Sequence, residues 1–410
     1  MHTLFSHINI AAIKNYLLYS FLFLLPTQLG TFFFLPISYI DGLRIDYLAP
    51  ALYATDIIAV LLIIIHWKDF LKYLQQNPQP KWIILILLFG FIIQIETTVQ
   101  PLIALYRIIK LAEAYFVYLI IRRVAIPFST LVNIFLASAL TQLSISTYHV
   151  LTGHSVQGGA YFLGERSFSL STPGIAKVAI NGIEVLRGYG TFSHPNSLAG
   201  FYLLIYAFVL YSKKTAGVWK YVLLGTTTLL IVLSFSKIAI LGVLLLSAYY
   251  TIRNLQNCLL CILSRIAVPL VLAIMIFSTQ GDSQSLQKRV WLTESAMKII
   301  TSHPWTGVGL GNYLYAQAAF PIPYAYVFLQ PVHNVFLLSI AEIGIPLFAF
   351  ITYLFSKYIK KLLFDPQVQA TLFVLILTGM FDHYWLTLQQ NFLLVLVVFG
   401  LLQTQEHVVK

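Results

Sequence analysis

Long runs of apolar residues, separated by short polar segments, fill most of this chain. A helix needs about 20 mostly apolar residues to cross a bilayer, and about twelve runs approach that length. The pattern therefore predicts an all-α fold, a polytopic membrane helical bundle. The predicted spans are residues 8–26, 48–66, 82–98, 102–121, 126–150, 195–211, 218–235, 237–252, 258–277, 333–354, 368–385 and 389–404.

Composition agrees with a membrane protein. The 410 residues are 59% hydrophobic and only 10% charged, whereas soluble domains carry about 25% charged residues. We expect residues 1–410 to form a single integral membrane domain. The first apolar run lacks a small-residue cleavage site, which predicts that it stays as the first span.

The net charge of +11 comes largely from basic residues in alternate short loops. This is the positive-inside pattern, and it predicts that these loops and both termini face the cytoplasm. It explains much of the basicity without nucleic acid as a partner. The clusters are Lys68, Lys72 and Lys81, then Arg122 and Arg123, then Lys213, Lys214 and Lys220, then Arg253, then Lys357, Lys360 and Lys361.

Two loops predicted to face outward are long, at residues 151–194 and 278–332. Within the second, Val290, Met297 and Ile300 recur at near-helical spacing, which predicts an amphipathic helix at the outer membrane surface. The glycine-rich run at 307–312 then matches neither a P-loop nor a dinucleotide fingerprint. It predicts a tight loop with exposed backbone N–H groups.

Two arginines stand out on the predicted outer side. Arg187 precedes a span, and Arg289, next to Lys288, begins the predicted surface helix. A guanidinium group binds phosphate or diphosphate through bidentate, charge-assisted hydrogen bonds. The alternative is that both are solvated or contact lipid headgroups.

Histidines open two of the predicted spans. His333 is suited to act as a base or hydrogen-bond donor, and the following Asn334 is a good helix cap. Glu342 lies inside the same span, where carboxylates are rare and usually functional or paired. The arrangement recurs at His194, Pro195 and Asn196, with proline suited to the first helical turn.

Other polar side chains have more ordinary explanations. Asp382 falls at an outer helix end, where it could orient a histidine or hold a sugar, although a structural role is the simpler explanation. Cys258 and Cys261 lie in an apolar run, which favours packing over redox or metal chemistry. Metal ligation is possible from a wider set, but no pair has ligand spacing within one helix, so no metal or cofactor is expected. That set is His194, His303, His333, His383 and Asp382.

Three segments resemble, in order and spacing, the O-antigen ligase and O-antigen polymerase superfamily. They are RGYGTFSHPNSLAGFY from Arg187, KRVWLTESAMKIITSHPWTGVGLGNY from Lys288, and PVHNVFLLSIAEIGI from Pro331. The resemblance is strongest over residues 185–350; the first 150 residues match only in hydropathy and in GLRIDYLAPALYATD.

The resemblance implies a GT-C-like membrane glycosyltransferase in the bacterial inner membrane, with an extracytoplasmic active site. Such enzymes transfer a glycan from an undecaprenyl-diphosphate carrier to an acceptor hydroxyl on a glycan, lipid or protein. It further implies inversion without metal, with Arg187 and Arg289 on the diphosphate and His333 near the acceptor. Lys237 stands where the family often has arginine, which keeps the charge but loses the fork. The remaining expected substrate contacts are His194, Asn196, Lys288, Asn334, Glu342 and Asp382.

Two other functions stay open from the sequence. A flippase or other secondary transporter would use charge inside the membrane, and Glu342 with the set Arg107, Lys110 and Glu113 hints at this. The absence of an internal repeat in the sequence counts against it. A protein O-oligosaccharyltransferase would share the chemistry and differ only in its acceptor.

Overall fold

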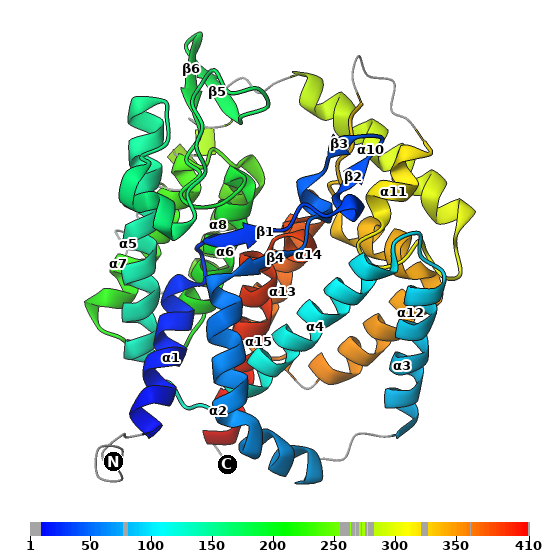
Figure 1. The fold of residues 1–410 in the computed structure, drawn as a ribbon. Helices are drawn as coiled ribbons and strands as arrows, with labels where there is room; N and C mark the ends of the chain where they lie inside the picture. The colour runs from blue at the N-terminus through cyan, green and yellow to red at the C-terminus, as the bar shows by residue number, and fades with distance from the viewer. Residues whose placement is uncertain are drawn as a thin grey trace, which may run out of the picture.

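The computed structural model is a bundle of helices whose loops carry short strands (Figure 1). It describes residues 10–76, 81–254, 283–320, 327–360 and 362–408, and single positions 263, 267, 270, 271, 273, 274 and 277. The predicted span at 258–277 and both cysteines lie outside the continuously described segments.

The helices follow most of the predicted spans. The first eight are α1 (Ile10–Leu24), α2 (Ala54–Gln76), α3 (Lys81–Glu96), α4 (Pro101–Ile121), α5 (Phe128–Thr152), α6 (Pro195–Leu210), α7 (Val218–Leu233) and α8 (Lys237–Arg253). After the segment around 255–282 come α10 (Ser283–Ser302), α11 (Tyr313–Ala318), α12 (Val335–Ile359), α13 (Pro366–Gly379), α14 (Tyr384–Thr387) and α15 (Gln389–Val408).

Helices α5 and α12 are long and apolar enough to cross a membrane by length and composition, and several others are apolar but shorter. The chain is thus mostly helical, as predicted, while the number of spans stays a prediction. Helix α10, helix α11 and the hairpin formed by β5 (Lys177–Ile180) and β6 (Ile183–Leu186) lie at the end of the bundle opposite the two chain ends (Figure 1).

Small antiparallel hairpins add β-structure that an all-α fold does not include. β1 (Gly30–Phe32) pairs with β4 (Ala51–Tyr53), with Gly30 opposite Tyr53. β2 (Tyr39–Ile40) pairs with β3 (Leu43–Arg44), and β5 pairs with β6. Short 3₁₀ helices fill the same loops at Pro36–Ser38, Asp46–Leu48 and Gly158–Leu163. These pairings give the loop backbone its hydrogen bonds without lengthening any helix.

Two predicted spans were wrong at their ends. Leu48 ends a short 3₁₀ helix and residues 49–53 are not helical, because 51–53 pair with β1; α2 then runs from Ala54 to Gln76. The predicted span at 368–385 ends at Gly379, and residues 380–383 form a turn before α14. Asp382 and His383 are buried in that turn, with side-chain partners on α6 and α14. Hydropathy cannot detect such a turn.

Helix α6 is the centre of the bundle, buried along nearly its whole length. Gly200 allows α14 to lie directly against it, since a Cβ there would come within 2.1 Å of the Tyr384 hydroxyl. This close approach brings the turn before α14 beside the beginning of α6.

Helix α10 is amphipathic, but its buried face differs from the predicted one. Leu292, Ala296 and Ile299 are fully buried, and only Ile300 of the predicted residues joins them. Val290 and Met297 are about half exposed, at 49% and 48%. The helix packs against α12 along its Leu292 face, which a weak three-residue periodicity could not identify.

The glycine-rich loop after α10 was expected to expose its N–H groups, and this was wrong. Val308 donates to the carbonyl of Ala341 and Gly309 to that of Glu342, both at 2.9 Å. Helix α12 is broken at Gly344, whose φ of 76° interrupts the helical backbone. The freed N–H of Ile345 donates to Pro304 at 2.9 Å, so the loop supplies hydrogen bonds that the broken helix lacks.

Candidate functional site

The first turn of α6 is built as its sequence predicts. Pro195 is the first helical residue, and His194 caps the helix from an extended backbone conformation. Nδ1 of His194 accepts a hydrogen bond from the Asn196 N–H at 3.1 Å. The cap fixes the His194 ring and leaves the Asn196 side chain free to point away from the helix.

A chain of hydrogen bonds connects Arg187 to Asp382 through Asn196. The Arg187 Nε donates to the carbonyl of Ser234 at 2.6 Å, and its Nη2 donates to Oδ1 of Asn196 at 2.7 Å. Nδ2 of Asn196 donates to Oδ2 of Asp382 at 3.0 Å. Side chains from the end of β6, the start of α6 and the turn after α13 therefore meet at one place.

The start of α12 reaches the same carboxylate. Nδ1 of His333 lies 3.4 Å from Oδ1 of Asp382, within ion-pair range, but the pair lacks hydrogen-bond geometry, and Nδ1 is buried without a hydrogen-bond partner among the described residues. The neighbouring Asn334 caps α12 as predicted, accepting from the N–H groups of Phe336 and Leu337.

Helix α10 contributes the second arginine. Nη1 of Arg289 donates to the carbonyl of Phe381 at 3.2 Å, one residue before Asp382. Nδ2 of Asn334 donates to Met380 at 3.3 Å in the same turn. Both predicted arginines and both predicted histidines therefore lie around the turn at 380–383. Arg289 and His333 contact it directly, Arg187 reaches it through Asn196, and His194 is close enough for the Asp382 charge to affect its pKa.

The charges of this cluster favour an anion. No described carboxylate forms an ion pair with Arg187 or Arg289. Burial, with the charge of Arg289 nearby, lowers the pKa of Arg187 to about 10, so it remains protonated at neutral pH. Two guanidinium groups with a single carboxylate between them leave a positive excess.

The protonation states within the cluster also follow from burial and neighbours. Burial and the charge of Arg187 lower the pKa of His194 to about 3, so this histidine is neutral. Burial opposes ionisation of Asp382, but His333, His383 and His194 together hold its pKa well below the ordinary value. The site therefore keeps the Asp382 carboxylate beside the neutral imidazole groups of His194 and His383.

Three further residues lie at this cluster although they were not predicted as substrate contacts: His383, Tyr47 and Arg166. His383 lies beside His333, with ring centroids 5.2 Å apart, and Tyr47 packs edge-on against His383 at 5.6 Å. Burial and the charge of Asp382 raise the pKa of Tyr47 to about 12, while the exposed Arg166 acts in the opposite direction. Tyr47 lies in the segment GLRIDYLAPALYATD, whose resemblance to the superfamily could have drawn attention to it. Nothing in the sequence singled out Arg166.

Three residues predicted to contact the substrate have their described contacts outside this cluster. Lys237 is exposed at the start of α8, 5.8 Å from the Phe277 ring centroid. Lys288 lies 5.7 Å from the ring centroid of Phe328. Glu342 lies along α12, and its carbonyl accepts from the glycine-rich loop. No described hydrogen bond joins any of the three to Asp382.

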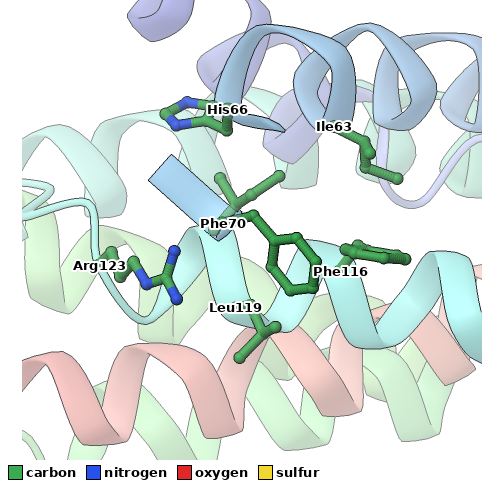
Figure 2. A pocket seen from close by; sticks show the side chains of 7 residues that line it. Ile63, His66, Phe70, Phe116, Leu119 and Arg123 are labelled. Carbon is green, nitrogen blue, oxygen red and sulfur yellow. The ribbon is translucent and has the colours of Figure 1, made fainter. Parts of the chain in front are cut away.

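A small pocket between α2 and α4 is separate from this cluster. Figure 2 shows His66, Phe70 and Phe116 around it with Arg123 at its edge. None of its lining residues belongs to the Arg187–Asp382 network. We therefore place the candidate site at the convergence of β6, α6, α10, α12 and the turn at 380–383.

A mostly helical chain with several apolar helices is the pattern of a membrane protein, and its candidate site is basic and contains histidines. Residues 221–352 match the family model for O-antigen ligase, which confirms the predicted resemblance to the O-antigen ligase superfamily. The family supports a membrane enzyme of surface polysaccharide assembly with a lipid-linked glycan substrate. No curated protein matches the chain.

The matched segment contains Arg289 and His333 but not Arg187 or Asp382. The fold brings these two outside residues to the matched ones through Asn196 and the turn at 380–383. The family match therefore covers Arg289 and His333, and the geometry adds Arg187 and Asp382 to the candidate site.

Proposed function

We propose that this protein transfers a glycan from an undecaprenyl-diphosphate-linked donor to an acceptor hydroxyl on the extracytoplasmic side of the bacterial inner membrane. The observation that carries the proposal is the convergence of Arg187 and Arg289 with the His333–Asp382 pair on one turn. A lipid diphosphate needs a cationic site at a membrane surface, and glycosyl transfer needs a base beside it.

The proposed reaction is a single displacement. The acceptor oxygen forms a bond to the anomeric carbon as the bond from that carbon to the diphosphate oxygen breaks, which inverts the anomeric centre. The acceptor proton passes to His333, and Asp382 stabilises the resulting imidazolium. The bonding electrons leave with the diphosphate, whose added negative charge Arg187 and Arg289 stabilise. No step requires a metal ion.

The arginines supply the larger part of this catalysis. Fixed donors directed at developing charge contribute about 10²–10³-fold in rate for each donor removed in well-studied enzymes. Arg187 is held by Ser234 and Asn196, so its guanidinium is fixed before the donor arrives. Arg289 donates from Nη1 to the Phe381 carbonyl, the one hydrogen bond of its side chain to the residues that the structure describes, and its other N–H groups are proposed to bind the anion.

Substitution of Arg289 tests the proposal directly. We expect Arg289→Ala to lower the rate of glycan transfer about 10²–10³-fold in proteoliposomes loaded with a polyprenyl-diphosphate oligosaccharide. Lys298→Ala is the matched control, because Lys298 is an exposed cation on the same helix. Full activity of Arg289→Ala, with both variants inserted equally, would contradict the diphosphate role.

The transporter alternative rested on charges inside the membrane. Lys110 forms ion pairs with Asp56 and with Glu113, and Gln389 donates to Asp56. These contacts link α2, α4 and α15, which supports a structural role for the charges. Turnover of the donor in proteoliposomes favours the enzyme, and movement of intact donor across the bilayer without turnover favours the transporter.

The acceptor distinguishes the remaining enzyme alternatives. A growing polysaccharide chain defines a polymerase, a lipid-linked core defines a ligase, and a protein hydroxyl defines a protein O-oligosaccharyltransferase. The proposed chemistry at Arg187, Arg289 and His333 is the same for all three. Offering each acceptor class to the same proteoliposomes assigns the activity by the mass of the product.

A further inference from the structure

Three side chains able to bind a metal converge in the candidate site, although the sequence spacing gave no sign of it. His333, Asp382 and His383 each offer one ligand atom, and these atoms all lie within 4.8 Å of one another. Nδ1 of His333 is 3.4 Å and Nε2 of His383 is 4.0 Å from Oδ1 of Asp382. The spacing rule failed because the ligands come from α12 and from a turn far along the chain.

These separations suit ligands that share one ion. Zinc binds imidazole nitrogen and carboxylate oxygen at about 2.0–2.2 Å with tetrahedral geometry, which places neighbouring ligand atoms about 3.3–3.5 Å apart. The His333–Asp382 distance already has this value, and the His383–Asp382 distance exceeds it by about half an ångström. The His333–His383 separation is within 4.8 Å, so the two rings must move closer for one ion to bind all three atoms.

The hydrogen bonds of His383 identify its free nitrogen. The Thr387 hydroxyl donates to the His383 carbonyl at 3.2 Å and therefore accepts from Nδ1, which lies 2.7 Å from the Thr387 oxygen. A neutral His383 with its proton on Nδ1 directs the lone pair of Nε2 toward Asp382.

Two imidazole nitrogens thus face one carboxylate oxygen, Oδ1 of Asp382. Nδ1 of His333 is buried and has no hydrogen-bond partner among the described residues. Oδ2 of Asp382 is held by Asn196 at 3.0 Å, so Oδ1 is oriented toward the histidines. Such outer hydrogen bonds to ligand side chains are typical of metal centres.

We propose that His333, Asp382 and His383 form a binding site for a divalent transition metal ion, with zinc the best match. Two imidazoles and a carboxylate favour zinc or its first-row neighbours over magnesium or calcium. Binding through Nδ1 leaves the proton of neutral His333 on Nε2, so neither ring nitrogen can accept the proton that the proposed transfer reaction delivers to His333. The ion therefore acts as a reversible inhibitor, and this consequence, unlike the binding itself, rests on the proposed function.

Cobalt provides a direct probe of the binding. The purified full-length protein in detergent, titrated with Co²⁺, is expected to show the visible absorption of four- or five-coordinate cobalt at one equivalent, and Zn²⁺ is expected to abolish it. His383→Ala is expected to remove this spectrum. His303→Ala, which changes an exposed histidine at the end of α10, is expected to retain it.

A second variant keeps the test informative if His383→Ala does not fold. Thr387→Val removes the hydroxyl that orients His383 and should weaken Co²⁺ binding about 10–100-fold. Absence of the spectrum in the wild-type protein, or an equal spectrum in His383→Ala and Thr387→Val, overturns the site. A spectrum in a protein that shows no glycan transfer leaves the site intact and counts only against the proposed function.

The inhibitory role has its own measurement. Zn²⁺ is expected to inhibit wild-type transfer over the concentration range in which it displaces Co²⁺, and chelation is expected to restore the rate. The same titration of Thr387→Val should shift both curves to higher concentration together. Transfer that continues unchanged with zinc bound overturns inhibition but not binding.

Discussion

Two buried carboxylates in this protein each face a histidine, and their surroundings differ. Glu165 accepts from His149 at 2.7 Å and from the backbone N–H groups of Val156 and Gln157 at 2.8 and 2.6 Å. Asp382 faces His333 and His383 and accepts from Asn196. Both carboxylates are nearly inaccessible, at 3% and 7% exposure.

The two clusters differ in whether a hydrogen-bonding group beside the carboxylate lacks a partner. The Glu165 partners, His149 apart, come from the same loop, and its three contacts close that loop onto the end of α5. Asp382 joins side chains from α6, α12 and α14, and the facing Nδ1 of His333 is unsatisfied among the described residues. Both carboxylates are therefore buried and face a histidine, whereas a ring nitrogen without a described hydrogen-bond partner lies beside Asp382.

Removing each charge separately gives the largest expected contrast. Asp382→Asn should lower glycan transfer about 10²–10⁴-fold, the range for loss of acid–base assistance, while the protein still inserts and folds. Glu165→Gln should lower the free energy of unfolding by about 1.5–3 kcal/mol, because it weakens hydrogen bonds that a buried carboxylate accepts from His149, Val156 and Gln157. Its transfer rate per folded molecule should change little.

Transfer assays and thermal unfolding in detergent together decide this comparison. A fully active Asp382→Asn protein would remove the distinction between the two carboxylates. So would a Glu165→Gln protein that folds normally and yet has lost transfer.

The neutral histidines predict a smaller effect of pH on stability. Burial lowers the pKa of His194 to about 3 and of His383 to about 4 in the folded protein. The unfolded chain, with histidine pKa near 6.5, binds more protons between these limits, so stability should fall as pH decreases from about 6.5. Each group contributes at most about 1.4 kcal/mol per pH unit.

Unfolding midpoints measured between pH 7 and pH 4.5 test this slope. His194→Asn should make the decline shallower, whereas Lys298→Ala should leave it unchanged. The charged and titratable groups that act on His194 are Arg187, Asp382, His333 and Arg289. Asp382 contributes only at lower pH, because its pKa is already depressed below the ordinary value. Parallel slopes for wild type and His194→Asn would contradict the neutral, buried His194.

The smallest expected effect concerns the helix cap. His194→Ala removes the acceptor for the Asn196 N–H and should cost about 1 kcal/mol of stability. Asparagine is a strong cap and should recover most of that loss. Thermal unfolding of the two variants at pH 7.5 measures the difference, and equal losses would show that the ring is held by packing rather than by the cap.

The sequence predicted the helices well because a membrane span has a strong compositional signal. It also predicted the caps at His194 and Asn334, since capping depends on adjacent residues. It did not predict the end of α13 at Gly379, because a buried turn with internally satisfied polar groups looks apolar enough to be helical. The small hairpins were missed because their strands are only two to four residues long.

The candidate site was partly predictable for the same reasons. Arg187, Arg289 and His333 are recognisable where polar residues adjoin apolar runs, and the structure brings all three to one turn. Tyr47 escaped because its importance depends on contacts between distant elements, and for the same reason His383 was named as a possible metal ligand but not as a substrate contact. Glu342 looked important by being a carboxylate within a span, and it packs against the glycine-rich loop: its carbonyl accepts from Gly309 and its carboxyl group from the Gly311 N–H.

The break in α12 has a mechanical consequence. Val308, Gly309 and Ile345 bind the loop after α10 across the interruption at Gly344, so α10 and the first half of α12 are joined backbone to backbone. Arg289 lies on α10, and His333 lies just before the first residue of α12. If the proposed donor tilts α10 as it binds Arg289, the hydrogen bonds to Ala341 and Glu342 would carry the first half of α12, and with it the proposed base His333, in the same movement.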